Sequence, residues 1–136
     1  MIRTYRKDSN FLFSIAVILF IVLGAAMTWA NYNYAVENPG GSDFLVHWMG
    51  TRHFLLEGTS PYSDRTALDI QTFAYGRPAE PGEHELRVAY PLYSITFFAP
   101  FALIPDFNLA RALWMTLLEF SLIGISLLSM RLCDWK

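Results

Sequence analysis

Two long apolar runs dominate the hydrophobic pattern of the chain. Residues 11–30 contain no charged residue, and residues 109–130 contain only Arg111 and Glu119. A helix rises about 1.5 Å per residue, so about 20 residues cover the roughly 30 Å of a hydrocarbon core. The pattern therefore predicts one transmembrane helix over residues 11–30 and another over residues 109–130.

A shorter apolar segment, residues 90–104, lies between them and contains Pro91 and Pro100. Pro91 fits the first turn of a helix, whereas Pro100 is expected to kink the helix or end it. After a tight turn, Asp106 or Asn108 is expected to cap the last helix. We expect this segment to cross the membrane; the alternative is a re-entrant segment.

Composition supports a membrane protein, with 54% hydrophobic residues, 16% charged residues and a mean hydropathy of +0.29. We therefore expect an all-α membrane protein with about three transmembrane helices. The first run also resembles a cleavable signal sequence, but it is longer than the usual apolar core of about 7 to 15 residues. An aromatic belt from Trp29 to Tyr34 follows it, which favours a retained anchor.

Basic residues near the spans predict the orientation. Arg3, Arg6 and Lys7 place segment 1–10 in the cytoplasm of a multi-pass protein of the cytoplasmic (inner) membrane, and loop 31–89 outside. Three crossings would leave the basic residues of the tail, residues 131–136, outside, against the positive-inside tendency. A re-entrant middle segment would return the tail to the cytoplasm.

The long loop is acidic and carries its own helices. It holds eight acidic residues and four arginines. Ser42 and Asp43 are expected to open a helix over residues 42–57 that stops at Gly58 and lies in the interface plane. A short helix is expected from Asp64 to Phe73.

Several classes of function are disfavoured by composition. A net charge of −2 without a basic patch argues against a nucleic-acid partner. Cys133 is the single cysteine, and no Cys/His spacing resembles a zinc site, so we expect no bound metal and no cofactor.

Asp43 is the carboxylate of most interest, because it stands at a helix N-terminus beside the membrane. A carboxylate there can accept a proton from a sugar hydroxyl as general base, while the helix dipole favours its charged form. Spacing alone favours a second capping residue instead. His47 follows one helical turn later on the same face.

Two arginines and one acidic residue inside the last apolar run complete the candidates. Arg52 or Arg87 can hold a lipid-linked phosphate in bidentate fashion, or can simply balance nearby acids. Glu119, inside the last span, would cost about 2.5 to 3.5 kcal/mol if it faced lipid. It should therefore face protein or water, with Arg111 as a possible partner, and the small residues beside it favour packing against other helices.

Five short motifs occur in a familiar order, namely Gly41-Ser-Asp-Phe44, Leu55-Leu-Glu-Gly-Thr-Ser-Pro-Tyr62, Ala89-Tyr-Pro-Leu92, Pro100-Phe-Ala-Leu-Ile-Pro105 and Ala112-Leu-Trp114. Together they cover residues 41–114. In this the chain resembles the N-terminal part of membrane glycosyltransferases of the C superfamily, which use polyprenyl-phosphate sugars. The closest resemblance is to glycosyltransferase family 87, mannosyltransferases that act on phosphatidylinositol mannosides.

The resemblance implies a multi-span helical enzyme and places Asp43 on the family's catalytic base. It implies a polyprenyl-phosphate sugar donor, a lipid or glycan acceptor and inversion at the anomeric carbon, with no nucleotide-binding domain and no tightly bound metal. His47, Arg52, Tyr62 and Arg87 are then expected to contact substrate.

Two departures from the family pattern matter. Leu92 stands where a second proline is usual, and the family has many more spans than three. We therefore expect a fragment or partial chain that is inactive alone and needs further helices. The rival hypothesis is a small non-enzymatic three-span protein that binds a partner through its last helix and Glu119. A piece of a transporter, in which Glu119 would matter most, is a third.

Overall fold

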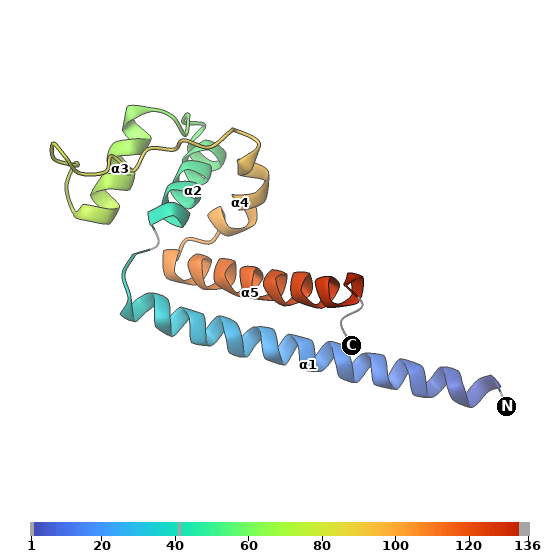
Figure 1. The fold of residues 1–136 in the computed structure, drawn as a ribbon. Helices are drawn as coiled ribbons and strands as arrows, with labels where there is room; N and C mark the ends of the chain where they lie inside the picture. Colours follow the sequence, from blue (N-terminus) through green and yellow to red (C-terminus); the bar gives the residue numbers. More distant parts are fainter. Residues whose placement is uncertain (1, 41, 134–136) are drawn as a thin grey trace.

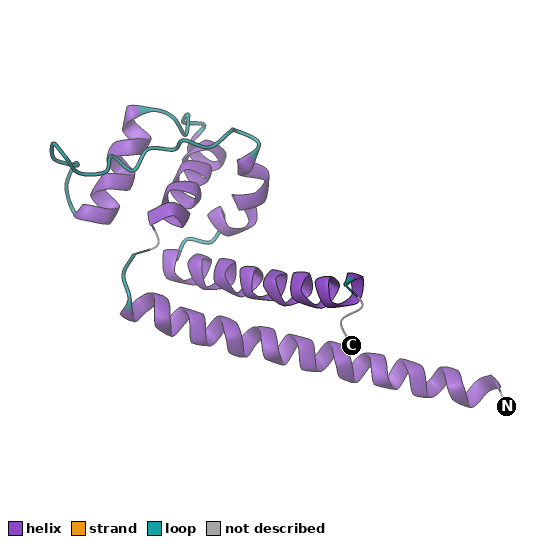
Figure 2. Cartoon of the chain, viewed as in Figure 1, coloured by secondary structure: helices purple, strands orange, loops and turns teal. Residues whose placement is uncertain are grey.

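The computed structural model describes residues 2–40 and 42–133, and in this part of the chain all regular structure is helical (Figure 2). The helices are α1 (Ile2–Glu37), α2 (Ser42–Arg52), the π-helix η1 (His53–Glu57), α3 (Asp64–Tyr75), α4 (Ser94–Ala102) and α5 (Phe107–Leu132). Residues 1, 41 and 134–136 lie outside the described residues, as do the side chains of residues 2–9, with Arg3, Arg6 and Lys7 among them, and of Ser42.

Two of these helices are long and apolar enough to cross a membrane, Asn10–Glu37 within α1 and Phe107–Leu132. This confirms an all-helical chain with two candidate spans. Figure 1 shows them side by side and antiparallel, with the end of α1 beside the start of α5. The rings of Phe20 and Phe120 contact each other in a tilted arrangement, with centroids 4.8 Å apart, and Arg111 Nη1 donates to the Asn38 carbonyl at 2.9 Å. We call this pair the hairpin.

The remaining helices gather at one end of the hairpin (Figure 1). We call residues 42–106 the head. Its core is aromatic: the ring of Phe44 on α2 contacts Phe98, Phe101 and Phe107, and stacks on Trp114 of α5 at 5.9 Å. Burial of these rings attaches the head to the first turns of α5, because large aromatic side chains dominate the apolar area in such a core.

The expected crossing over residues 90–104 is not confirmed. The helix found there, α4, has nine residues, which at about 1.5 Å each is less than half of a hydrocarbon core. Residues before Ser94 form a turn after Pro91, and the helix ends two residues beyond Pro100. Pro100 limits the helix, since it cannot donate the backbone hydrogen bond that would continue it.

The helix expected over residues 42–57 is present as α2 followed by η1, and it ends at Gly58 in a left-handed conformation. Its expected place in the interface plane is not confirmed. Phe44, Trp48 and Met49 are buried in the head core, so the apolar side of α2 faces protein. Asp106 caps α5 as expected, because its carboxylate accepts from the Leu109 amide at 2.6 Å.

Candidate functional site

Asp43 lies in the first turn of α2, on the surface of the head. Its side chain is exposed, and its negative charge acts on His47, one turn further along the helix. An exposed carboxylate at a helix start has the properties of a general base, and the same properties serve a structural role in the first turn.

His47 is held between two aromatic rings. Its ring centroid lies 3.9 Å from those of Tyr90 and Phe98, in stacked arrangements with interplanar angles of 30° and 13°. Burial lowers the pKa of His47 below its ordinary value, and the charge of Asp43 opposes part of this shift. The imidazole is therefore mainly neutral at pH 7. In this form one ring nitrogen donates a hydrogen bond and the other accepts one.

Tyr62 joins this group through the backbone. Its hydroxyl donates to the Tyr90 carbonyl oxygen at 2.7 Å, which fixes the turn after Gly58 against the segment before α4. His47 and Tyr62 are thus linked through Tyr90, and Asp43 lies one helical turn before His47. The cavity between His47, Tyr62 and Tyr90 measures only about 10 Å³, so a sugar ring would have to bind on the outer surface of this group.

Arg52 is not part of that group. Its Nη1 donates to the Ala102 carbonyl at 2.8 Å, and its guanidinium lies 5.7 Å from the ring centroid of Trp48. Ala102 is the last residue of α4, where carbonyl groups lack helical partners and carry the negative end of the dipole. Arg52 therefore caps α4.

Arg87 lies on another side of the head, between two carboxylates. It donates to Asp64 at 2.7 Å and to Glu85 at 2.6 Å. A phosphate at this guanidinium would have to displace one of these exposed partners. Of the five residues expected at the substrate site, His47 and Tyr62 are joined through Tyr90, Asp43 lies one turn from His47, and Arg52 and Arg87 have other partners.

Glu119 lies inside the hairpin and is hydrogen-bonded to α1. Asn31 Nδ2 donates to Glu119 Oε2 at 3.0 Å and to Thr116 Oγ1 at 3.1 Å, and Thr28 adds a bond to Thr116 at 3.2 Å. Asn31 directly follows the apolar run 11–30. Glu119 thus faces protein, at the edge of that run nearest the head. Arg111 is not its partner, because the guanidinium donates to the Asn38 carbonyl.

His53 belongs to a structural network between η1 and α3. Its Nε2 lies 3.7 Å from carboxylate oxygens of both Glu57 and Asp69, and its Nδ1 lies 3.3 Å from Thr66 Oγ1. Within the described residues, no cluster of three or more His, Cys, Asp or Glu side chains is arranged to hold a metal ion. The two helix histidines do not share a site.

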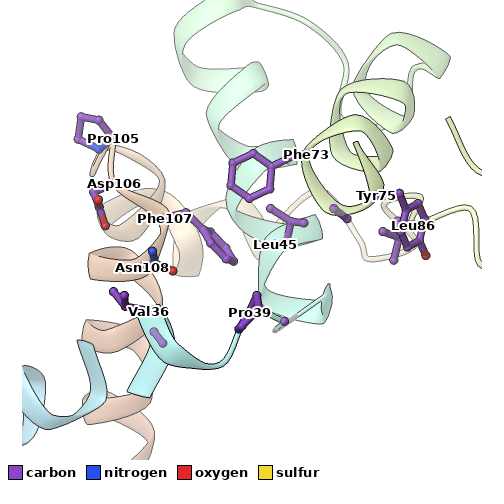
Figure 3. Close-up of a pocket in the computed structure, with 13 residues that line it drawn as sticks. Val36, Pro39, Leu45, Phe73, Tyr75, Leu86, Pro105, Asp106, Phe107 and Asn108 are labelled. Carbon is purple, nitrogen blue, oxygen red and sulfur yellow. The ribbon is translucent and has the colours of Figure 1, made fainter. Parts of the chain in front are cut away.

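A larger cavity does not include Asp43 in its lining. It is an apolar groove of about 590 Å³ between the end of α1, α2, α3 and the start of α5, and Leu45, Phe73 and Phe107 line it (Figure 3). Its volume falls in the range of small-molecule sites. Asp43 is not among its lining residues, although Gly40 and Leu45 flank it in sequence.

No protein-family model, curated protein or solved structure matches the chain.

Sequence reasoning missed two residues that organise these sites. Tyr90 was assigned only to a motif at the start of a span, yet it contacts both His47 and Tyr62. Asn31 was assigned to an aromatic belt, yet it is the donor to Glu119. An amide next to an uncharged apolar run was the available signal for Asn31, because such a side chain needs a partner close to lipid.

Proposed function

We propose that this chain is the N-terminal segment of an integral membrane glycosyltransferase that transfers a sugar, mannose-like, from a polyprenyl-phosphate donor to a lipid or glycan acceptor. The observation that carries the proposal is the exposed carboxylate of Asp43 at the start of α2, one turn from the stacked ring of His47. The order of the five sequence motifs suggests the reaction class, sugar transfer from a polyprenyl phosphate, because it resembles the order in membrane glycosyltransferases.

The proposed topology has α1 and α5 as crossings, with the N-terminus in the cytoplasm and the head on the outer face. Two features support it: the helices of the head gather at one end of the hairpin, and Arg131, in the last turn of α5, lies toward the other end. With two crossings, the basic residues of both ends lie on the cytoplasmic side, in agreement with the positive-inside tendency.

In the proposed reaction, an acceptor hydroxyl attacks the anomeric carbon of the donor from the side opposite the phosphate. Asp43 takes the proton of that hydroxyl as the new carbon–oxygen bond forms. The bond between the anomeric carbon and the phosphate oxygen breaks, and polyprenyl phosphate leaves with the electron pair. His47 and Tyr62 are assigned to contact the sugar on the outer surface of their group.

The site requires more helices than this chain provides. The cavity between His47, Tyr62 and Tyr90 is too small for a sugar, and two small residues one turn apart, Ser121 and Gly124, are exposed on one side of α5. Small residues in a spanning helix allow close approach of a neighbouring helix. We expect the 136-residue chain to be inactive alone and its active site to be completed by such helices.

The test measures the transfer of radiolabelled mannose from a polyprenyl-phosphate donor. It uses membranes that contain the protein expressed from its own gene. We expect Asp43→Asn to abolish transfer, because an amide cannot take the proton, while the abundance of the protein is unchanged. Asp69→Asn on α3 is the matched control and should retain transfer. Activity of the Asp43→Asn protein, or no donor-dependent transfer by the unmodified protein, would refute the proposal.

One observation favours a second candidate, a non-enzymatic membrane protein that binds a partner through α5. The same pair, Ser121 and Gly124, is exposed on the hairpin, and nothing lies within 4 Å of a Cβ placed on Gly124. Glu119 itself already has a donor on α1, so this pair, more than the carboxylate, would form the contact. In that case Gly124→Leu would prevent partner binding and Asp43→Asn would have no effect.

A further inference from the structure

The outward side of α4 is unusually apolar for a surface helix. Phe98 and Ala102 face the head core, with 8% and 0% of their area exposed. Tyr93 and Phe97, one turn apart, face away and are 77% and 74% exposed. Leu103 extends this side at 57%. We call Tyr93, Phe97 and Leu103 the α4 stripe.

Charge is distributed unevenly over the head. From Val88 to Pro105 the sequence has no charged residue. The ion pairs of the described head belong instead to η1, α3 and the segment after α3, namely Arg65 with Glu57, Arg77 with Glu80 and Glu83, Arg87 with Asp64 and Glu85, and His53 with Glu57 and Asp69. The ion pairs are therefore on one side of the head, whereas α4 contributes no charged residue of its own and is contacted by the Arg52 guanidinium at the Ala102 carbonyl.

Contacts with α5 give the order of these two sides along the hairpin. Phe73 of α3 meets α5 at its first residue, Phe107, with ring centroids 5.3 Å apart. Phe98 and Phe101 of α4 meet α5 at Trp114, at 5.0 and 5.4 Å. Seven residues of helix correspond to about 10 Å, so α4 lies about that much nearer the membrane than the α3 contact.

The same contacts place α4 at the edge of the apolar layer. Trp114 lies two residues before Thr116, which is bonded to Asn31, the residue directly after the apolar run of α1. Figure 1 agrees, because α4 is on the side of the head toward which α1 and α5 extend. The α4 side of the head therefore faces along the hairpin, toward the apolar runs.

We propose that α4 is a half-inserted helix whose stripe contacts the lipid bilayer at the boundary between headgroups and acyl chains. Helices with one apolar face bind there with that face immersed by about 5 to 10 Å. The proposal explains why residues 90–104 are apolar enough to resemble a crossing although the helix is too short to make one. It depends on α1 and α5 being crossings and is independent of any catalytic role of Asp43.

The experiment measures the depth of α4 in the full chain, reconstituted in phosphatidylcholine and phosphatidylglycerol vesicles. In a Cys133→Ser background, a nitroxide is attached at Phe97→Cys, and its collision rates with oxygen and with a water-soluble nickel complex are compared. Two matched sites calibrate the scale: Leu68→Cys, exposed on α3, and Leu19→Cys, exposed within the apolar run of α1.

We expect the oxygen-to-nickel ratio at Phe97 to be several-fold higher than at Leu68 and lower than at Leu19. A ratio equal to that at Leu68 would place the stripe in water, and one equal to that at Leu19 would indicate a crossing. Low rates with both reagents would mean that protein covers the stripe. Each of these three results overturns the proposal. Tyr93→Cys repeats the measurement one turn away, and neither side chain belongs to the buried core.

Discussion

At the scale of single residues, Glu119 shows how a costly side chain is accommodated in an apolar helix. Its carboxylate accepts from Asn31 on the neighbouring helix. Ser121 and Ser126 on the same helix donate to the carbonyls of Leu117 and Leu122, four residues earlier. In a low-polarity environment these bonds replace those that water would make. The hydrogen bonds between α1 and α5 also fix the register of the hairpin.

His47 provides a residue-scale prediction. Because burial lowers its pKa below 6.5, the unfolded chain binds more protons than the folded head just below that pH, and stability falls as pH falls through this range. We expect the NMR titration of His47 to have its midpoint below 6.5. Asp43→Asn removes the charge that opposes the shift, so it should move the midpoint lower still.

His47→Phe is the companion variant, because it retains a ring between Tyr90 and Phe98 but cannot titrate. Its unfolding should depend less on pH between 7 and 5 than that of the unmodified protein. A His47 midpoint at or above 6.5 would show that the ring is not held in the buried, stacked position.

Local signals in the sequence identified several residues correctly. Asp106 was recognised as one of two possible caps, Gly58 as a helix stop and Pro100 as a residue that ends or kinks a helix, because each acts on neighbouring backbone. Partners distant in the chain were not recognised. Asn31 and Glu119 are 88 positions apart, and Arg52 and Ala102 are 50 apart, so no local pattern relates them.

At the scale of elements, the places that the sequence predicts for α2 and α4 are not confirmed. The helix at 42–57 was expected at the interface and is the centre of the head core, whereas the segment at 90–104 was expected to cross and is a short helix with an exposed apolar side. Periodicity and composition report that a segment is apolar. They do not report whether protein or lipid covers it.

The cap formed by Arg52 provides the element-scale prediction. Arg52→Gln should reduce the free energy of unfolding of the head by about 1 to 2 kcal/mol, because it removes a charged hydrogen bond to the end of α4. Chemical denaturation of the reconstituted chain, followed by the fluorescence of Trp48 and Trp114, measures this loss. Arg65→Gln, which removes an exposed ion pair with Glu57, is the control and should cost less.

The two roles of Arg52 are distinguished by the same variant. If its guanidinium held the donor phosphate, Arg52→Gln would leave stability unchanged and weaken donor binding in the complete protein. That result would contradict the assignment of Arg52 as a cap of α4.

At the scale of the whole molecule, the chain is a helical hairpin with a head at one end (Figure 1). The hydrophobic pattern predicted both long helices, since length and lack of charge suffice for that. The number of crossings depended on residues 90–104, and the sequence left a crossing and a re-entrant segment both open. The nine residues of α4 and its contacts with Trp114 favour a segment that stays on the head side.

The measurement that tests this architecture most directly is the location of the two chain ends. Reporters active only in the cytoplasm are fused before Met1 and after Lys136 of the full chain, and a reporter active only outside is fused at the same positions. Two crossings predict that both ends are cytoplasmic. A cytoplasmic N-terminus with an external C-terminus would require a third crossing, and would contradict both the hairpin topology and the half-inserted α4.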